Sequence, residues 1–257
     1  MSGKAEPTVK SALPRCRERW QHALRGQNHV DGLFSTIDLA ALAFFIGAWI
    51  CYAITVESTP LGRRSLNARM NEHRYHWMEQ MLAREVRIID TQIVAALQNG
   101  NAFFASTSLI AVGGTLTLMH STDQVLDVIG ALPFGIRTSA TQWEAKTMGL
   151  AIIFVYAFFK FAWSYRLYNY VAIMIGATPS SEFKESADAR THIRRAARLS
   201  EIAGQHFNRG QRAFFFALGY LGWFVSPWLF IAATIAVVIV MWRRQFASDS
   251  RHAVVGA

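Results

Sequence analysis

The chain has 257 residues, of which 52% are hydrophobic and 17% are charged, and it carries a formal net charge of +9. A charged fraction this low argues against an ordinary soluble domain and favours a membrane protein. In a membrane protein, the excess of Lys and Arg favours contact with anionic lipid headgroups over nucleic acid, so we expect the lipid bilayer, and no nucleic acid, as a partner.

The membrane domain is predicted at residues 34–246, between a basic polar tail at 1–33 and a C-terminal tail at 247–257. About 20 helical residues cross about 30 Å of hydrocarbon, so an apolar segment of this length predicts a membrane-spanning helix. Four segments qualify: 36–56, 102–119 with upstream support from 97–101, 147–177, and 213–241, in which Pro227 predicts a kink.

Two long, charged connections, roughly 57–101 and 178–212, are predicted to be amphipathic helices. From Leu66 onward, apolar residues recur every three or four positions, which is the spacing of one helix face. The second of these connections has a weaker stripe, and Ser180 or Ser181 can cap its start. Asn99-Gly100-Asn101 and Asn208-Arg209-Gly210 then predict bends where the chain enters the bilayer.

The chain also repeats itself. Ala43-Phe44-Phe45-Ile46-Gly47-Ala48-Trp49 returns as Ala157-Phe158-Phe159-Lys160-Phe161-Ala162-Trp163, and weaker matches follow both copies in the same order. This pattern predicts two parallel repeats, about 34–119 and about 147–242, each built as span, amphipathic helix, span. Coincidence between two aromatic-rich helices is the alternative reading.

The long connections carry more Lys and Arg near the membrane than the other side does. The positive-inside rule therefore predicts that both amphipathic helices are cytoplasmic and that both termini lie outside, in a plasma or bacterial inner membrane. Arg243 and Arg244, directly after the last span, argue for the opposite orientation.

Lys160 is the most informative candidate for a ligand or ion path, because a charge at membrane depth costs about 2.5–3.5 kcal/mol on insertion scales. It either contacts an anion or a carboxylate in the protein interior, or reaches the interface along its own stem. The other candidates for the path are Arg166, Asn169, Ser106, Thr107 and Ser108. The three hydroxyls equally suit close helix packing.

Arg209, Arg212, Arg243 and Arg244 are candidates for contact with lipid headgroups. We expect no metal site, because no cysteine or third histidine joins His73 and His76, which share a helix face with only the carboxylates of Glu72 and Glu79 nearby. No catalytic constellation and no cofactor motif is visible, so we expect neither an enzyme nor a cofactor.

Several phrases resemble one known family. They are Trp77-Met78, Arg84-Glu85, Arg87-Ile88-Ile89-Asp90-Thr91-Gln92, Phe103-Phe104-Ala105-Ser106-Thr107, Gly113-Gly114, Phe158 to Ser164, Arg166 to Tyr170 and Trp242-Arg243-Arg244-Gln245-Phe246. From about residue 36 to 250, the chain resembles the domain of unknown function 599 family. The resemblance implies a multi-span membrane protein and no mechanism.

The fold predicted from these features is all-α: an integral membrane four-helix bundle with long cytoplasmic helices. Because the apolar stripes of those helices need cover, we expect a structural, scaffolding or accessory-subunit role, in a homo-oligomer or with a partner membrane subunit. The alternative is a small, anion-preferring channel or transporter with Lys160 near its path.

Overall fold

The computed structural model describes residues 33–130 and 138–255, and all regular structure among them is helical. The all-α class is therefore confirmed. The predicted tail at 1–33 lies outside the described residues except for its last position. In chain order the elements are α2 (Thr36–Ser58), η3 (Gly62–Arg64), α3 (Leu66–Ala83), α4 (Ile88–His120), α5 (Thr122–Gly130), α6 (Ala140–Gly176), η4 (Ser181–Phe183), α7 (Ala187–Tyr220), η5 (Leu221–Phe224), α8 (Pro227–Phe246) and α9 (Asp249–Val255).

The chain divides into two compact units, residues 1–40 and residues 41–257. In the first unit, Ser35 caps the start of α2. Its hydroxyl accepts a hydrogen bond from the backbone N–H of Asp38 (3.1 Å) and donates one to the Asp38 carboxylate (2.7 Å). Serines fix later helix starts in the same way, because a hydroxyl satisfies an N–H that has no partner within the helix. They are Ser65 at α3, Ser139 at α6, Ser186 at α7 and Ser226 at α8.

Four helices are long and apolar enough to cross a membrane, as the sequence predicted: Thr36–Ser58, Ile88–His120, Ala140–Gly176 and Pro227–Val254. The predicted extent of the fourth span, 213–241, is wrong. The chain turns back at η5, so residues 213–220 belong to α7 and α8 begins at Pro227. Proline suits the first position of a helix because its missing N–H is not needed there. Pro227 therefore starts a helix and does not kink one.

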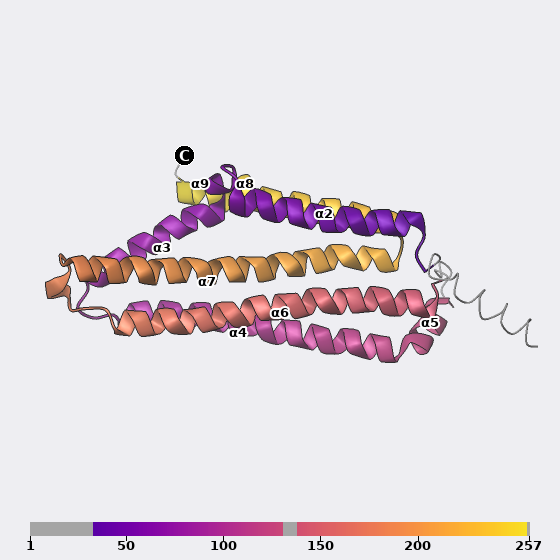
Figure 1. Ribbon diagram of the computed structural model, residues 1–257, viewed down its shortest axis with the longest axis horizontal. Coiled ribbons are helices and arrows are strands. Elements are labelled where there is room, and N and C mark those ends of the chain that lie inside the picture. The colour runs from indigo at the N-terminus through magenta and orange to yellow at the C-terminus, as the bar shows by residue number, and fades with distance from the viewer. Residues whose placement is uncertain (1–32, 131–137, 256–257) are drawn as a thin grey trace, which may run out of the picture. The chain divides into compact units, whose positions relative to one another are not determined.

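Helices α4, α6 and α7 run side by side in alternating directions in the second unit (Figure 1). α2 packs on the second half of α7 and on α8 through aromatic rings. Phe45 of α2 lies 5.5 Å from Phe216 of α7 and 5.0 Å from Phe230 of α8, between ring centroids. Trp49 stacks on Phe216 at 4.8 Å. The contact between α2 and its neighbours is thus made largely by long side chains.

The helices α4, α6 and α7 have 33, 37 and 34 residues. At 1.5 Å per residue they reach about 50–55 Å, well beyond the roughly 30 Å of a hydrocarbon core. Their ends next to the α6–α7 connection pack with α3 around a separate apolar core. It is formed by Met78, Met81, Leu82, Val94, Leu167, Tyr168, Val171, Ile175, Ala189, Ile193, Ala196, Ala197 and Ala203.

The two long connections are helical, as predicted, but the predicted bends are wrong. Asn99-Gly100-Asn101 lies inside α4, and Asn208-Arg209-Gly210 lies inside α7. At both positions, the amphipathic segment continues directly into the apolar segment as one unbroken helix. The first connection breaks instead between α3 and α4, at residues 84–87. The start of α7 at Ala187 also comes later than the predicted cap at Ser180 or Ser181.

Helices α2 and α6 point toward one end of this unit, and α4 and α7 point toward the other, as parallel repeats require (Figure 1). The second copy, however, joins its amphipathic segment and the following apolar segment in one helix, α7, where the first copy uses α3 and α4. The matched tryptophans also have different neighbours: Trp49 stacks on Phe216, and Trp163 lies edge-on to His206 at 6.5 Å. The duplication stays a prediction.

The C-terminal helix α9 contacts the turn that follows α2. The Nε of Arg251 donates a hydrogen bond to the carbonyl of Arg64 (3.1 Å). α9 therefore lies at the end where α3 begins. The prediction that the C-terminus and the long connections lie on opposite sides is wrong, because the turn at η5 adds a reversal that hydropathy does not reveal. Arg243 and Arg244 now fall on the same side as the other basic residues of the long connections.

Candidate functional site

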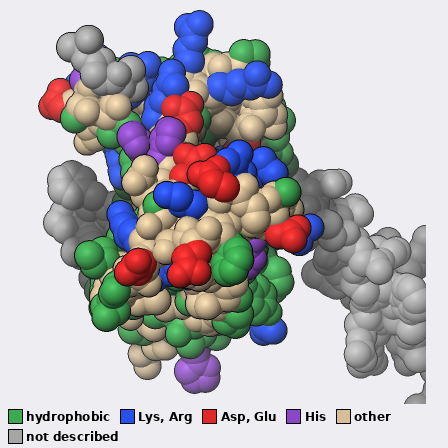
Figure 2. All heavy atoms as spheres, turned by 90° about the vertical axis from the view of Figure 1, so that its left-hand side faces the viewer, with side chains coloured by type: hydrophobic (Ala, Val, Ile, Leu, Met, Phe, Trp, Pro, Cys, Tyr) green, Lys and Arg blue, Asp and Glu red, His purple; other side chains and the backbone are tan. Residues whose placement is uncertain are grey.

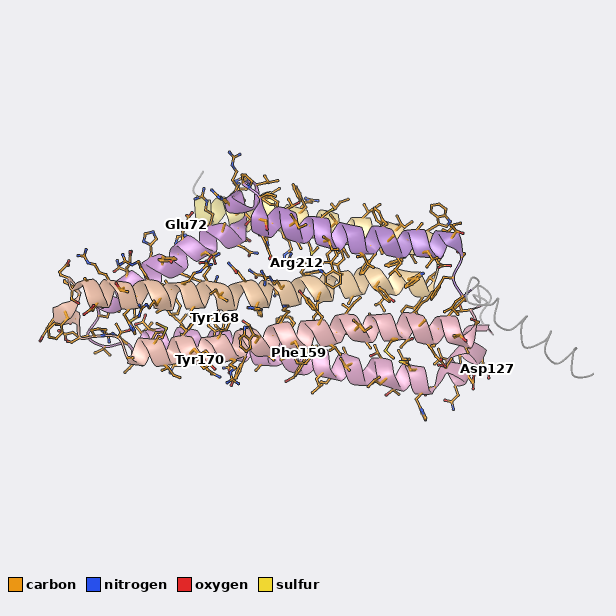
Figure 3. All side chains as sticks on the ribbon, viewed as in Figure 1. Glu72, Asp127, Phe159, Tyr168, Tyr170 and Arg212 are labelled. Carbon is orange, nitrogen blue, oxygen red and sulfur yellow. The ribbon has the colours of Figure 1, made fainter. Side chains whose placement is uncertain are left out.

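The polar centre of the second unit lies where α2 ends against the middle of α7. The carboxylate of Glu57 accepts from Nε and Nη2 of Arg209 (3.0 and 2.6 Å) and from Nη2 of Arg212 (2.6 Å). The Arg212 side chain is only 7% exposed, whereas those of Glu57 and Arg209 are about one third exposed. In Figure 3, Arg212 lies between α2 and α7. One carboxylate thus holds two guanidinium groups and joins the two helices.

A second carboxylate, Glu201, lies on α7 and binds side chains of both α7 and α3. It accepts from Nη1 of Arg198 (2.7 Å), from the Gln205 amide (3.1 Å) and from the Asn71 amide of α3 (3.5 Å). Asn71 in turn accepts from Nη1 of Arg74 (2.7 Å). The network therefore fixes α3 against α7 beside the Glu57 cluster.

The Arg74 guanidinium lies over Gly204 of α7. A Cβ at Gly204 would lie 2.5 Å from an Arg74 nitrogen, so the guanidinium occupies the space that a larger side chain at this position would take. The Nη2 of Arg74 also reaches the Tyr168 hydroxyl of α6 at 3.4 Å. Arg74 thus connects α3, α6 and α7 just beyond the Glu57 cluster.

An open pocket of about 500 Å³ lies between the Glu57 cluster and the Glu201 network. Its charged lining consists of Arg63, Arg198, Arg209, Arg212, Glu57 and Glu201, and amide, hydroxyl and small apolar residues form the rest. A smaller hollow of about 100 Å³ adjoins it, shares Asn67, Asn208 and Arg212 with it, and extends to Arg244 of α8. Figure 2 views the end of the molecule where α6 joins α7 and shows basic and acidic side chains gathered there.

Lys160 lies on α6 level with this site, because its neighbour Phe161 meets Gly210 of α7. Its Nζ is 5.0 Å from the Tyr156 ring centroid, and Glu57 and Arg209 are close enough to act on it electrostatically. Lys160 is therefore partly buried beside the Arg209–Glu57 pair.

The other predicted path residues make local contacts. Thr107 and Ser108 donate to the carbonyls of Phe103 and Phe104, one turn back in α4, and Ser106 is exposed. Arg166 is exposed and donates from Nε to the Tyr170 hydroxyl (2.7 Å). Asn169 accepts from Gln98 of α4 at 2.5 Å.

Of the four arginines predicted to contact headgroups, Arg209 and Arg212 come together at Glu57. Arg244 lies at the adjoining hollow with its guanidinium carbon 5.1 Å from the Phe215 ring centroid, and Arg243 is exposed. The sequence reasoning missed Glu57. Glu57 is a single carboxylate in the last turn of an apolar helix. Its place at the end of that helix was the only sequence signal that it could pair with an arginine.

The residues of the site lie within one matched family region. A family model described as protein of unknown function, DUF599, matches residues 40–250. The chain belongs to this family. No curated protein and no solved structure matches the chain. The match confirms the family resemblance noted in the sequence, and in this DUF599 protein the pocket from Glu57 to Arg244 lies wholly inside the matched residues.

Proposed function

We propose that this DUF599 protein is an integral membrane protein with a structural or accessory role, and that it acts as a homo-oligomer whose copies meet along α4. The apolar parts of α2, α4, α6 and α8, together with the second half of α7, occupy the hydrocarbon. The α3 layer projects into water on the basic, cytoplasmic side.

The lengths of the helices support this placement. Lys146 of α6 donates to the Trp223 carbonyl (2.8 Å) in the η5 turn, and Lys160 lies level with Arg209. The apolar segment between the two lysines covers about 21 Å at 1.5 Å per residue. This is somewhat less than a hydrocarbon core, and both lysine stems can extend toward an interface.

The observation that carries the proposal is the exposed apolar face of α4 outside this layer. Ile88 and Ile89 are each 66% exposed, Ile93 is 39% exposed, and Val86 just before the helix is 67% exposed. Because Phe104 stacks on Phe161 (5.2 Å), Ile93 and Ile88 lie about 17 and 24 Å beyond the level of Lys160. In water such a patch favours association.

The same face continues into the membrane layer at spacings of three and four residues, through Ala96, Gly100, Phe103, Thr107 and Ile110. Small residues along it allow two helices to approach closely in lipid. A partner that covers this face must be apolar in lipid and also extend into water over the same length. A second copy of α4 meets both demands, and a two-fold axis would pair the faces.

The contacts of the path residues also favour association over an anion path. The hydroxyls of Thr107 and Ser108 are bonded to their own helix, and Lys160 lies beside the Tyr156 ring. A path would instead need these groups directed at a shared, open cavity.

The mass of the purified protein in an uncharged detergent tests the proposal. We expect a dimer for the natural chain and a monomer for the double variant Ile89→Glu/Ile93→Glu, because two facing carboxylate pairs repel. Ile173→Glu is the matched control: Ile173 is 66% exposed on α6 in the same water-side layer. A monomeric natural chain, or a dimer that survives the double substitution, would contradict the proposal.

A further inference from the structure

Beyond association, we propose that the pocket between α2, α3 and α7 binds a phosphate group, carried either by an anionic phospholipid or by a soluble phosphate ester. The proposal uses no residue of the α4 face. Its failure would leave the oligomer untouched, and the loss of the oligomer would leave the pocket intact.

The charge of the lining favours an anion. Four arginines line the main pocket against two glutamates, and Arg244 adds a fifth cation at the adjoining hollow. Each glutamate is already bonded to an arginine, Glu57 to Arg209 and Arg212 and Glu201 to Arg198. The lining therefore keeps an excess of positive charge after its internal pairs are formed, and an anion balances it.

The guanidinium groups are held in place before any ligand arrives. A guanidinium carries five N–H donors, so the bonds to Glu57 leave donors on both Arg209 and Arg212 for a second acceptor. Arg212 is almost fully buried, and its guanidinium carbon lies 5.7 Å from the Tyr52 ring centroid. Fixed, planar donors of this kind suit the oxygens of phosphate better than a mobile lysine does.

The size and the remaining lining indicate the class of ligand. A volume of about 500 Å³ lies in the range of small-molecule sites and exceeds what a bare phosphate fills. Asn67 and Asn208 add amide groups to the lining. These groups match the hydroxyls of a glycerol or sugar attached to phosphate. The expected ligand is therefore a phosphorylated polyol.

The location of the pocket is compatible with both a phospholipid headgroup and a soluble phosphate ester. The pocket lies level with Lys160 and Arg209, where we place the boundary of the hydrocarbon, and the adjoining hollow leads to Arg244 on α8. A lipid phosphate at this depth reaches the pocket from the side, and a soluble ester reaches it from water. Arginine clusters at this level of membrane proteins bind lipid headgroups through the same contacts.

The test uses the full chain in uncharged detergent micelles, with calorimetric titration of two probes. Dioctanoyl phosphatidylglycerol represents the headgroup and glycerol 3-phosphate represents the soluble ester. Dioctanoyl phosphatidylcholine and sodium chloride of equal ionic strength are the controls for amphiphile and salt. The variants are Arg63→Gln and Arg209→Gln, with Arg195→Gln as the matched control, because Arg195 is exposed on α7 and lines neither hollow.

We expect saturable binding of at least one probe, weakened about tenfold by either pocket substitution and unchanged by Arg195→Gln. Binding of the lipid alone identifies a headgroup site. Binding of glycerol 3-phosphate that displaces the lipid identifies a site for soluble esters. If Arg209→Gln does not fold, Arg63→Gln decides, since Arg63 is exposed and outside the Glu57 pair. Binding of neither probe above the controls, or equal weakening by Arg195→Gln, would overturn the proposal.

Discussion

The attachment of α2 to α7 should depend strongly on the charge of Glu57. Glu57→Gln keeps the shape of the side chain but removes the charge that holds Arg209 and Arg212. Breaking a fully buried ion pair costs about 3–5 kcal/mol, and exposed pairs contribute about 0–1 kcal/mol. Since Arg212 is 7% exposed and the other two side chains about one third, we expect a loss of about 2 kcal/mol in the free energy of unfolding.

Reversible unfolding in mixed micelles, followed by tryptophan fluorescence, measures this loss. The matched control is Glu185→Gln, which removes an ion pair to Arg190 whose side chains are 74% and 58% exposed. We expect a change below about 0.5 kcal/mol there. A double-mutant cycle with Arg212→Gln should give a coupling of about 1–2 kcal/mol. If Glu57→Gln and Glu185→Gln had equal effects, or the coupling were zero, the reasoning would be refuted.

Three further outcomes follow from the contacts described. Gly149→Ala places a Cβ 2.1 Å from the Tyr220 hydroxyl, so we expect the free energy of unfolding to fall by about 1–3 kcal/mol. Adding Tyr220→Phe should restore part of the loss, and an unchanged unfolding midpoint in Gly149→Ala would contradict this contact. Asp90→Asn removes the charge that binds Arg84 at 2.7 Å from a fully buried position, and we expect a loss of about 2–3 kcal/mol in the same unfolding assay, whereas a neutral effect would contradict a stabilising role of this ion pair. In liposomes, we expect only background anion flux for both the natural chain and Lys160→Met, and a flux that the substitution abolishes would favour the channel alternative.

Hydropathy and periodicity predicted the coarse fold because both depend on sequence-local properties. Apolar runs gave four candidate spans, and the three-or-four spacing after Leu66 gave the amphipathic helices. The turn at η5 was not predicted, because its residues Leu221-Gly222-Trp223-Phe224 are as apolar as the helices that they join. Its signals were Gly222, where a Cβ would lie 2.9 Å from the Leu229 carbonyl oxygen, and Pro227.

The site was less predictable, because its pairs join residues far apart in the chain. Arg209 and Arg212 were singled out as basic residues near a membrane boundary, but their partner Glu57 lies more than 150 residues away. No local pattern specifies which carboxylate closes such a cluster. The helical continuity at Gly100 and Gly210 was missed for a related reason: glycine lowers helix propensity, and tertiary packing overrides it. At Gly210 that packing is visible, since a Cβ there would lie 2.7 Å from the Phe161 ring.

The central claim is that α6 crosses lipid in its first half and continues into water, on the side where the chain also ends. Single cysteines at Ile152, Ile173 and Ser250, in a chain with Cys16→Ser and Cys51→Ser, test it with a membrane-impermeant maleimide. Ile152 and Ile173 are 61% and 66% exposed in the isolated molecule and lie about 32 Å apart along α6. We predict that Ile173→Cys and Ser250→Cys react from the same side of sealed vesicles and that Ile152→Cys stays unlabelled. Labelling of Ile152→Cys at the rate of Ile173→Cys, or reaction of the other two from opposite sides, would contradict the account.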